Sequence, residues 1–120
     1  MRLKKEVVVT DVAPAIWYAL GRIDEIHMNL FRAGCIVTSL RDGIHNPGSL
    51  HPKGLAVDIR TSDLLGMDRQ EFASAVSAAL GPLGYDVVLE GLNATAATTS
   101  VHLHCEFDPK GAETFIPRLS

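Results

Sequence analysis

The chain has 120 residues, of which 47% are hydrophobic and 21% charged, and its formal net charge is −3. This length predicts a single domain, 1–120, because one core usually spans about 100–200 residues, and the apolar fraction excludes a disordered chain. An acidic balance without a basic run argues against a phosphate-backbone partner, so we expect no nucleic acid among the ligands.

The sequence also argues against a membrane protein. No segment approaches the roughly 18 consecutive apolar residues that a spanning helix needs. Only Val7 to Val9 follow the charged N-terminus, whereas a secretory signal needs about 7–15 apolar residues. We therefore expect synthesis in the cytoplasm, with no membrane partner. Cys35 and Cys105 lie far apart without a CxxC spacing, so we expect buried thiols rather than a disulfide.

The first long element is a helix predicted from Val12 to Ala33. Thr10 or Asp11 is a suitable N-cap, Pro14 suits the first turn, and Gly34 would end the helix. Its apolar stripe is predicted from residues at helical spacing, namely Ile16, Leu20, Ile23 and Leu30, widened by Trp17 and Phe31. His27 is expected on the helix surface.

The rest of the chain predicts strands, a loop at 41–53 and a second helix. The expected strands are Cys35–Leu40, Leu55–Arg60, Tyr85–Glu90 and Val101–Phe107, with Val7–Val9 as a further edge strand. Asp68 and Glu71 resemble a capping box at the start of the second helix, which Gly81 and Pro82 would end. These elements predict an α+β fold with a small, twisted, mainly antiparallel sheet packed on two helices.

The last strand alternates strictly between apolar and polar residues. Its apolar set is Val101, Leu103, Cys105 and Phe107, and its polar set is His102, His104, Glu106 and Asp108. A period of two places both histidines on one face and Cys105 on the other, so Cys105 is not expected to bind a metal with them. Two neighbouring imidazoles are either solvated surface groups, or one is held by a metal and the other is a catalytic donor.

Asp58 lies in the middle of an apolar strand, where a carboxylate is expensive to bury unless it is paired or bound to a metal. His51 precedes it in the loop, Gly54 lets that loop double back, and Ala56 leaves room beside the carboxylate. Two imidazoles and one carboxylate make a three-ligand zinc site with an open position for water, which is typical of catalytic sites.

These residues match a known pattern. The motif SxHxxGxAxD is met by Ser49, His51, Gly54, Ala56 and Asp58, and a late HxH is met by His102 and His104. The pattern resembles the zinc peptidases that include D-alanyl-D-alanine carboxypeptidases and phage L-alanyl-D-glutamate endopeptidases. It is also similar to the hedgehog signalling domain, which shares their zinc architecture. The resemblance covers roughly Thr38 to Lys110 and implies a hedgehog/DD-peptidase-like fold.

The resemblance implies a role for each residue of the motif. Zinc (Zn²⁺) would be held by His51, Asp58 and His104. Glu90 would be the general base, and His102 would donate to the transition state. Many of these peptidases carry the base three residues before the last histidine ligand, a position held here by Val101. Glu90, on the preceding strand, matches the hedgehog-like placement instead. Residues 91–101 form a long connection, which could be a lid or an inert loop.

Three further residues are candidates for binding substrate. Arg41 stands where these peptidases carry an arginine that could clamp a carboxylate or carbonyl. Ser49 could bond the substrate or shape the turn, and His45 could line the cleft. Glu106 faces the same way as the histidines and could orient one of them.

The expected function is zinc-dependent hydrolysis of a peptide bond in bacterial peptidoglycan peptides. D-alanyl-D-alanine carboxypeptidase and L-alanyl-D-glutamate endopeptidase activities both remain open. We expect a monomer that a lysis system could release to the cell wall. The alternatives are a non-catalytic, hedgehog-like zinc-binding interaction module and a purely structural zinc site.

Overall fold

The computed structural model describes residues 1–42, 50–91 and 101–107. In this part of the chain, five strands form one sheet in the order β1-β2-β3-β5-β4. The strands are β1 (Arg2–Leu3), β2 (Ile36–Ser39), β3 (Ala56–Arg60), β4 (Tyr85–Glu90) and β5 (His102–Phe107). The helices are α1 (Pro14–Phe31) and α2 (Gly66–Leu80), with short 3-10 turns η1 (His51–Lys53) and η2 (Gly81–Leu83).

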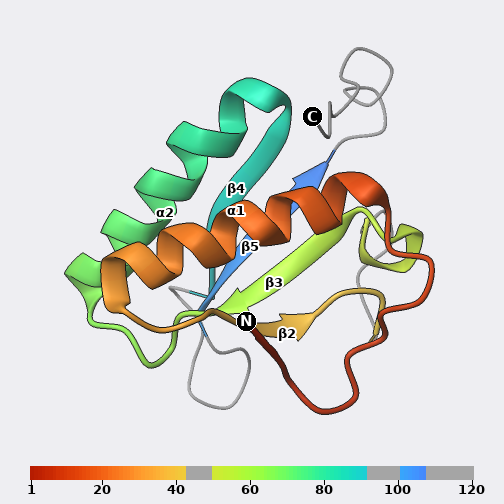
Figure 1. Ribbon diagram of the computed structural model, residues 1–120, viewed down its shortest axis with the longest axis horizontal. Coiled ribbons are helices and arrows are strands. Elements are labelled where there is room, and N and C mark those ends of the chain that lie inside the picture. The colour runs from red at the N-terminus through yellow and green to blue at the C-terminus, as the bar shows by residue number, and fades with distance from the viewer. Residues whose placement is uncertain (43–49, 92–100, 108–120) are drawn as a thin grey trace.

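The two long helices pack against each other and against the sheet (Figure 1). β1 pairs with β2 in parallel, and the other three strand pairings are antiparallel. The sheet is therefore mixed but mainly antiparallel, and the predicted α+β class with two helices is confirmed. Within the described ranges, neither helix has the length and apolar character to span a lipid bilayer.

The core lies between the helices and one face of the sheet. Helix α1 contributes Ile16, Leu20 and Ile23, which are fully buried at the predicted spacing. Helix α2 contributes residues at a spacing of four, namely Phe72, Val76 and Leu80. The strands complete the core with Val57, Ile59, Leu103 and Cys105. Because consecutive strand residues face opposite sides, Asp58 and His104 are left on the sheet face away from the helices.

The predicted start of the first helix is wrong in detail. Neither Thr10 nor Asp11 caps α1; its N-cap is Ala13, which makes no side-chain hydrogen bond. The Ala13 N–H instead donates to the carbonyl of Gly54, 2.9 Å away. A tertiary contact therefore satisfies a group that a side chain was expected to cap. Pro14 occupies the first turn as predicted, and the helix ends at Arg32 in the left-handed conformation, before Gly34.

Two further boundaries differ from expectation. The edge strand is Arg2–Leu3 rather than Val7–Val9. Val8 makes two hydrogen bonds beyond the end of β2 without forming a strand. Its N–H donates to the Asp42 carboxylate, and its carbonyl accepts the N–H of Arg41. Helix α2 begins two residues before Asp68, which lies in its first turn and does not cap it.

Two residues of α1 exchange their expected environments. Trp17, expected in the apolar stripe, is 39% exposed, and His27, expected on the surface, is only 8% exposed. The His27 ring packs edge-on against Phe31 and Phe72, and its Nδ1–H donates to the Ala33 carbonyl at 2.6 Å. The cost of burying this histidine is reduced, because its Nδ1–H is hydrogen-bonded and its ring packs against two aromatic side chains.

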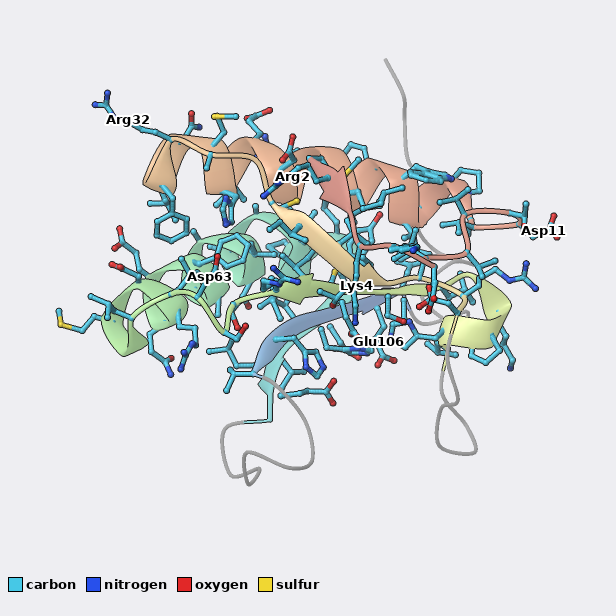
Figure 2. All side chains as sticks on the ribbon, turned by 90° about the horizontal axis from the view of Figure 1, so that it is seen from below. Arg2, Lys4, Asp11, Arg32, Asp63 and Glu106 are labelled. Carbon is cyan, nitrogen blue, oxygen red and sulfur yellow. The ribbon has the colours of Figure 1, made fainter. Side chains whose placement is uncertain are left out.

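The cysteines and the acidic end of β5 follow the predicted alternation. Cys35 and Cys105 are free, buried thiols, and burial raises the pKa of each to about 12. Cys105 belongs to the core, on the face opposite the histidines, as predicted. Glu106 projects on the side of the sheet away from α1 (Figure 2).

Gly54 provides a test of how the loop before β3 is held. Its φ is 71°, and a Cβ there would lie 2.3 Å from the Asp11 carbonyl oxygen. We expect Gly54→Ala to destabilise the protein by about 1–3 kcal/mol, because both the backbone conformation and the close approach exclude a side chain. Gly21→Ala is the matched control: it lies in α1 with open space around it and should stabilise by up to about 1 kcal/mol. Chemical denaturation measures both, and equal stabilities for the two variants would contradict the expectation.

Candidate metal centre

Strand pairing brings the polar residues of three strands together on the open face of the sheet. In the register of β3 and β5, Asp58 lies opposite His104. In the register of β4 and β5, Glu90 lies opposite His102. Directly paired residues of antiparallel strands share a face with Cβ atoms about 4.5–5.5 Å apart. These four side chains therefore form one cluster, although 46 positions separate Asp58 from His104 in the sequence.

A tight turn delivers His51 to the same place. His51 begins the 3-10 turn η1, with Pro52 after it and Gly54 closing the turn in the left-handed conformation. The Gly54 N–H donates to the His51 carbonyl at 2.9 Å, and the Leu55 N–H donates to the Leu50 carbonyl at 3.1 Å. The turn thus folds the loop back onto β3, as the position of Gly54 predicted.

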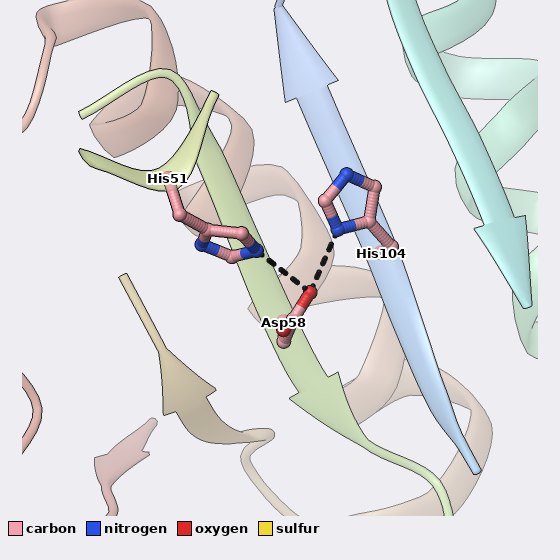
Figure 3. A group of neighbouring side chains, drawn as sticks. All are labelled: His51, Asp58 and His104. Atoms are coloured by element: carbon pink, nitrogen blue, oxygen red, sulfur yellow. Dashed lines mark hydrogen bonds and ion pairs between the residues drawn. The ribbon is translucent and has the colours of Figure 1, made fainter. Parts of the chain in front are cut away.

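Two imidazoles, those of His51 and His104, converge on one carboxylate oxygen of Asp58 (Figure 3). His51 Nε2 lies 3.2 Å from Asp58 Oδ1, and His104 Nδ1 lies 2.8 Å from the same atom. The ring centroids of His51 and His104 are 5.1 Å apart. The group is well shielded, since His51 is 3% exposed and His104 9%.

The far nitrogen of each imidazole is also held. His51 Nδ1–H donates to the Leu40 carbonyl at 2.6 Å, which can only accept. His104 Nε2–H donates to the Glu106 carboxylate at 2.8 Å, as expected for a residue that orients this histidine. In a neutral imidazole with one nitrogen protonated, the other carries a lone pair. When both rings are neutral and keep these bonds, the lone pairs of His51 and His104 point towards Asp58.

Charge explains how such a group remains together. Burial by itself raises the pKa of Asp58, but hydrogen bonds with His104 and His51 and attraction to the nearby imidazoles outweigh it, so the pKa lies well below its usual range. Burial lowers the pKa of His104, yet its bonds to Asp58 and Glu106 and the charges of Asp58 and Glu90 raise it to about 9. Without a metal, the proton of His104 supplies positive charge beside the carboxylate. When the rings are neutral, the ionised carboxylate and the two nitrogen lone pairs need another cation between them.

A metal ion can supply that charge. One ligand atom from each of His51, Asp58 and His104 lies within 4.8 Å of the others, a separation that one ion can span. Metal-bound histidines typically donate their other N–H to a carbonyl or carboxylate, which is the arrangement of Leu40 and Glu106 here. The predicted ligand set is therefore brought together, and the group could hold a metal ion.

Glu90 and His102 lie beside this group, closer to solvent. His102 Nε2 is 3.1 Å from Glu90 Oε1 and 3.8 Å from Asp58 Oδ1. Glu90 Oε1 also lies 3.5 Å from His104 Nδ1. The Glu90 side chain is 49% exposed, whereas that of His102 is 16% exposed. The proposed base and donor thus contact each other next to the ligand set, and their catalytic roles stay predictions.

The candidate substrate residues are only partly placed. Arg41 Nη1 donates to the Thr10 carbonyl at 2.8 Å and lies 3.5 Å from an Asp11 oxygen, while its Nε donates to the Pro52 carbonyl. The guanidinium thus joins the N-terminal segment to the turn that carries His51. Ser49 and His45 lie outside the described residues, as do positions 92–100 of the connection that could act as a lid.

Two supporting groups were not anticipated from the sequence. One is the Leu40 carbonyl, a backbone atom whose role no side-chain pattern reveals. The other is Asp42, whose Oδ1 accepts the N–H of Leu40 at 2.9 Å and that of Val8 at 3.1 Å. Asp42 therefore positions the backbone to which His51 bonds. An Asp-Gly dipeptide at 42–43 indicates a turn, but not which group the turn presents.

The pKa of His104 predicts how stability depends on pH when the protein has been treated with a chelator. The folded protein binds the His104 proton more tightly than the unfolded chain, where the ordinary value is 6.5. This contribution to stability is complete below pH 6.5 and is lost as pH rises through about 9. We expect the midpoint temperature of thermal unfolding to decrease as the pH is raised from 7 to 9.5. In His104→Gln this decrease should be smaller. A wild-type profile as flat as that of the variant would contradict the assignment.

The chain was also compared with known proteins. No family model, no curated protein and no solved structure matches it. What the cluster can do chemically is therefore inferred from its own atoms and from the motif that its residues form.

Proposed function

We propose that the chain is a zinc-dependent peptidase that hydrolyses a peptide bond in bacterial peptidoglycan peptides. The observation that carries the proposal is the convergence of His51, Asp58 and His104 on one point, with Glu90 and His102 adjoining on the solvent side. We further propose that the α+β fold is of the hedgehog/DD-peptidase-like type, on the strength of the motif that spans these residues.

Zinc is the metal that this donor set favours. Two imidazole nitrogens and one carboxylate oxygen are borderline ligands that suit Zn²⁺, whereas Mg²⁺ and Ca²⁺ prefer oxygen alone. Three protein ligands leave a fourth tetrahedral position for water or substrate. The cysteines add no soft ligand, because Cys105 faces the core. A closed structural site would be expected to take a fourth protein ligand.

The chemistry needs a base next to that position. Zinc in such a site acidifies a water molecule and polarises a peptide carbonyl. Glu90 lies 3.5 Å from His104 Nδ1, so its carboxylate can accept the proton of that water and later deliver it to the leaving amine. Its exposure on the open face of the sheet allows a peptide to approach. Glu106, by contrast, is engaged by the far nitrogen of His104 and is a positioning residue.

His102 is placed to act on the negative charge that develops during the reaction. Its Nε2 lies between the carboxylates of Glu90 and Asp58, at 3.1 Å and 3.8 Å. From that position its Nε2–H can donate to the developing charge of the carbonyl oxygen. The pair would thus divide the work: Glu90 moves the proton and His102 stabilises the charge.

The substrate class is proposed from the motif alone. Ser49-x-His51-x-x-Gly54-x-Ala56-x-Asp58 with a late HxH is typical of peptidases acting on D-alanyl-D-alanine or L-alanyl-D-glutamate bonds. A monomer that reaches the wall during lysis remains our expectation. The competing proposal, a hedgehog-like binding module without turnover, shares the ligand set. Removing the Glu90 carboxylate distinguishes the two proposals. It should slow hydrolysis by a peptidase, whereas a binding module performs no hydrolysis that could be slowed.

The ligand assignment predicts the effects of substitutions on zinc affinity. His51→Ala and His104→Ala should abolish tight binding, because each removes a direct ligand. Glu106→Gln should weaken binding by about 10–100-fold, because it removes the partner that orients His104. Asp86→Asn is the matched control, since Asp86 lies opposite Glu106 on β4 and is exposed, and should change affinity little. Competition with a chromogenic chelator measures each value. Wild-type affinity in His51→Ala would remove that residue from the ligand set.

The base assignment predicts the effect of Glu90→Gln on hydrolysis. The variant should keep stoichiometric zinc but release new amino groups from peptidoglycan about 10²–10⁴-fold more slowly, because a positioned base contributes roughly that factor. Asp86→Asn, which removes the same charge from the same strand, should hydrolyse normally. Amino-group release from D-alanyl-D-alanine and L-alanyl-D-glutamate peptides is the measurement. If zinc-loaded wild type releases none from any wall peptide, the binding-module proposal replaces this one.

A further inference from the structure

The base and donor belong to a second group that could hold a metal ion. Within the described part of the chain, one ligand atom from each of Asp58, Glu90 and His102 also lies within 4.8 Å of the others. We infer that these three residues form a second, weaker site for a divalent cation, which shares the Asp58 carboxylate with the first.

The geometry links the two sites through one side chain. Asp58 Oδ1 is 2.8 Å from His104 Nδ1 in the first group and 3.8 Å from His102 Nε2 in the second. Glu90 Oε1 is 3.1 Å from His102 Nε2. A carboxylate has two oxygens and about four acceptor positions, so it can serve two cations at once. Centres with two metals about 3.5–4 Å apart are a known arrangement in hydrolytic enzymes.

The charge on this face of the sheet favours a second cation. The described carboxylates that share it are Asp58, Asp86, Glu90 and Glu106, placed in adjacent rows by the strand register. The guanidinium of Arg60, opposite His102, brings one positive charge to the same rows. With neutral histidines the net charge is about −3, so one bound dication leaves the face still negative.

The second site should be the weaker one. Its ligand Glu90 is half exposed and must lose side-chain freedom on binding, whereas His51 and His104 are buried and are held at both nitrogens. A cation there also meets the repulsion of the first across the shared carboxylate. We expect a dissociation constant about 10–100-fold above that of the first site. This factor is comparable to the loss of metal affinity when the hydrogen-bond partner that orients a ligand is removed.

Occupation of the second site has a consequence that rests on the proposed function. A cation bound by Glu90 and His102 engages the carboxylate that must accept a proton and the imidazole that must donate one. Excess zinc is then a reversible inhibitor of the same protein that needs one equivalent of zinc for activity. The inhibition involves no covalent change and is removed by dilution or by a weak chelator.

The experiment is a titration of chelator-treated protein with zinc chloride, followed by calorimetry and by metal analysis after equilibrium dialysis. The wild type should bind a tight first equivalent and a weaker second one. Glu90→Gln and His102→Ala should each keep the first equivalent and lose the second, raising its dissociation constant by more than tenfold. Asp86→Asn removes one charge from the same face and strand without removing a ligand, so it should retain both equivalents within about fivefold.

Three results would overturn the inference. One is binding of a single equivalent by the wild type up to millimolar zinc. Another is a second equivalent that persists in both Glu90→Gln and His102→Ala. A third is equal weakening by Asp86→Asn and Glu90→Gln, which would indicate a general effect of charge. Circular dichroism of each variant shows that it is folded, and the two ligand variants check one another.

The titration separates this inference from the proposed function. Two binding steps with the expected variant pattern, in a protein that cleaves no wall peptide, would support the second site and reject the peptidase. Cleavage that one equivalent of zinc activates and further zinc does not inhibit, with a single binding step, would support the peptidase and reject the second site.

Discussion

The structure depends on a single cross-strand pairing, that of Asp58 on β3 with His104 on β5. One carboxylate oxygen of Asp58 lies within hydrogen-bond distance of both His104 and His51, and the pKa of that carboxyl is lowered despite its burial. A shift of β5 by one residue would turn His104 into the core and expose Cys105. The apolar residues that alternate with the histidines prevent that shift, because Leu103 and Cys105 are buried against the helices. The core and the group formed by His51, Asp58 and His104 thus specify the same register.

The sequence was sufficient to predict the faces of the strands but not how the strands are paired. Alternation alone assigned His102, His104 and Glu106 to one side and Cys105 to the other, because side-chain direction in a strand follows from a period of two. That Glu90 lies opposite His102 depends on the register of β4, which no local pattern encodes. The motif predicts that His51, Asp58 and His104 act together, and the pairing of β3 with β5 brings Asp58 and His104 into contact. The Leu40 carbonyl could not be predicted, because a backbone acceptor leaves no trace in residue identity.

Two of the wrong predictions, the cap of α1 and the position of His27, share a physical cause. The caps expected for α1 and α2 are local side-chain devices, and in α1 a tertiary contact from Gly54 satisfies the Ala13 N–H instead. His27 was assigned to the surface on the basis of its polarity, yet Phe31 and Phe72 enclose it and the Ala33 carbonyl satisfies it. In each case a partner distant in sequence, or a backbone atom, overrides the local preference of the residue. The same class of contact, Leu40 with His51, supports the candidate site.

The long connection between β4 and β5 does not weaken the assignment of Glu90. Closing a longer loop costs only a slowly growing entropy, about 0.6 kcal/mol for each doubling of length. Six directly paired positions between β4 and β5 far outweigh such a term, and one of those pairs is Glu90 with His102. The distance between Glu90 and His102 is therefore set by strand pairing, and not by the number of residues in the loop. Two buried imidazoles, each bonded at both nitrogens, and the half-exposed carboxylate of Glu90 lie on the same face of the sheet. A group that could hold a metal ion is thus fixed in place beside a carboxylate that solvent can reach.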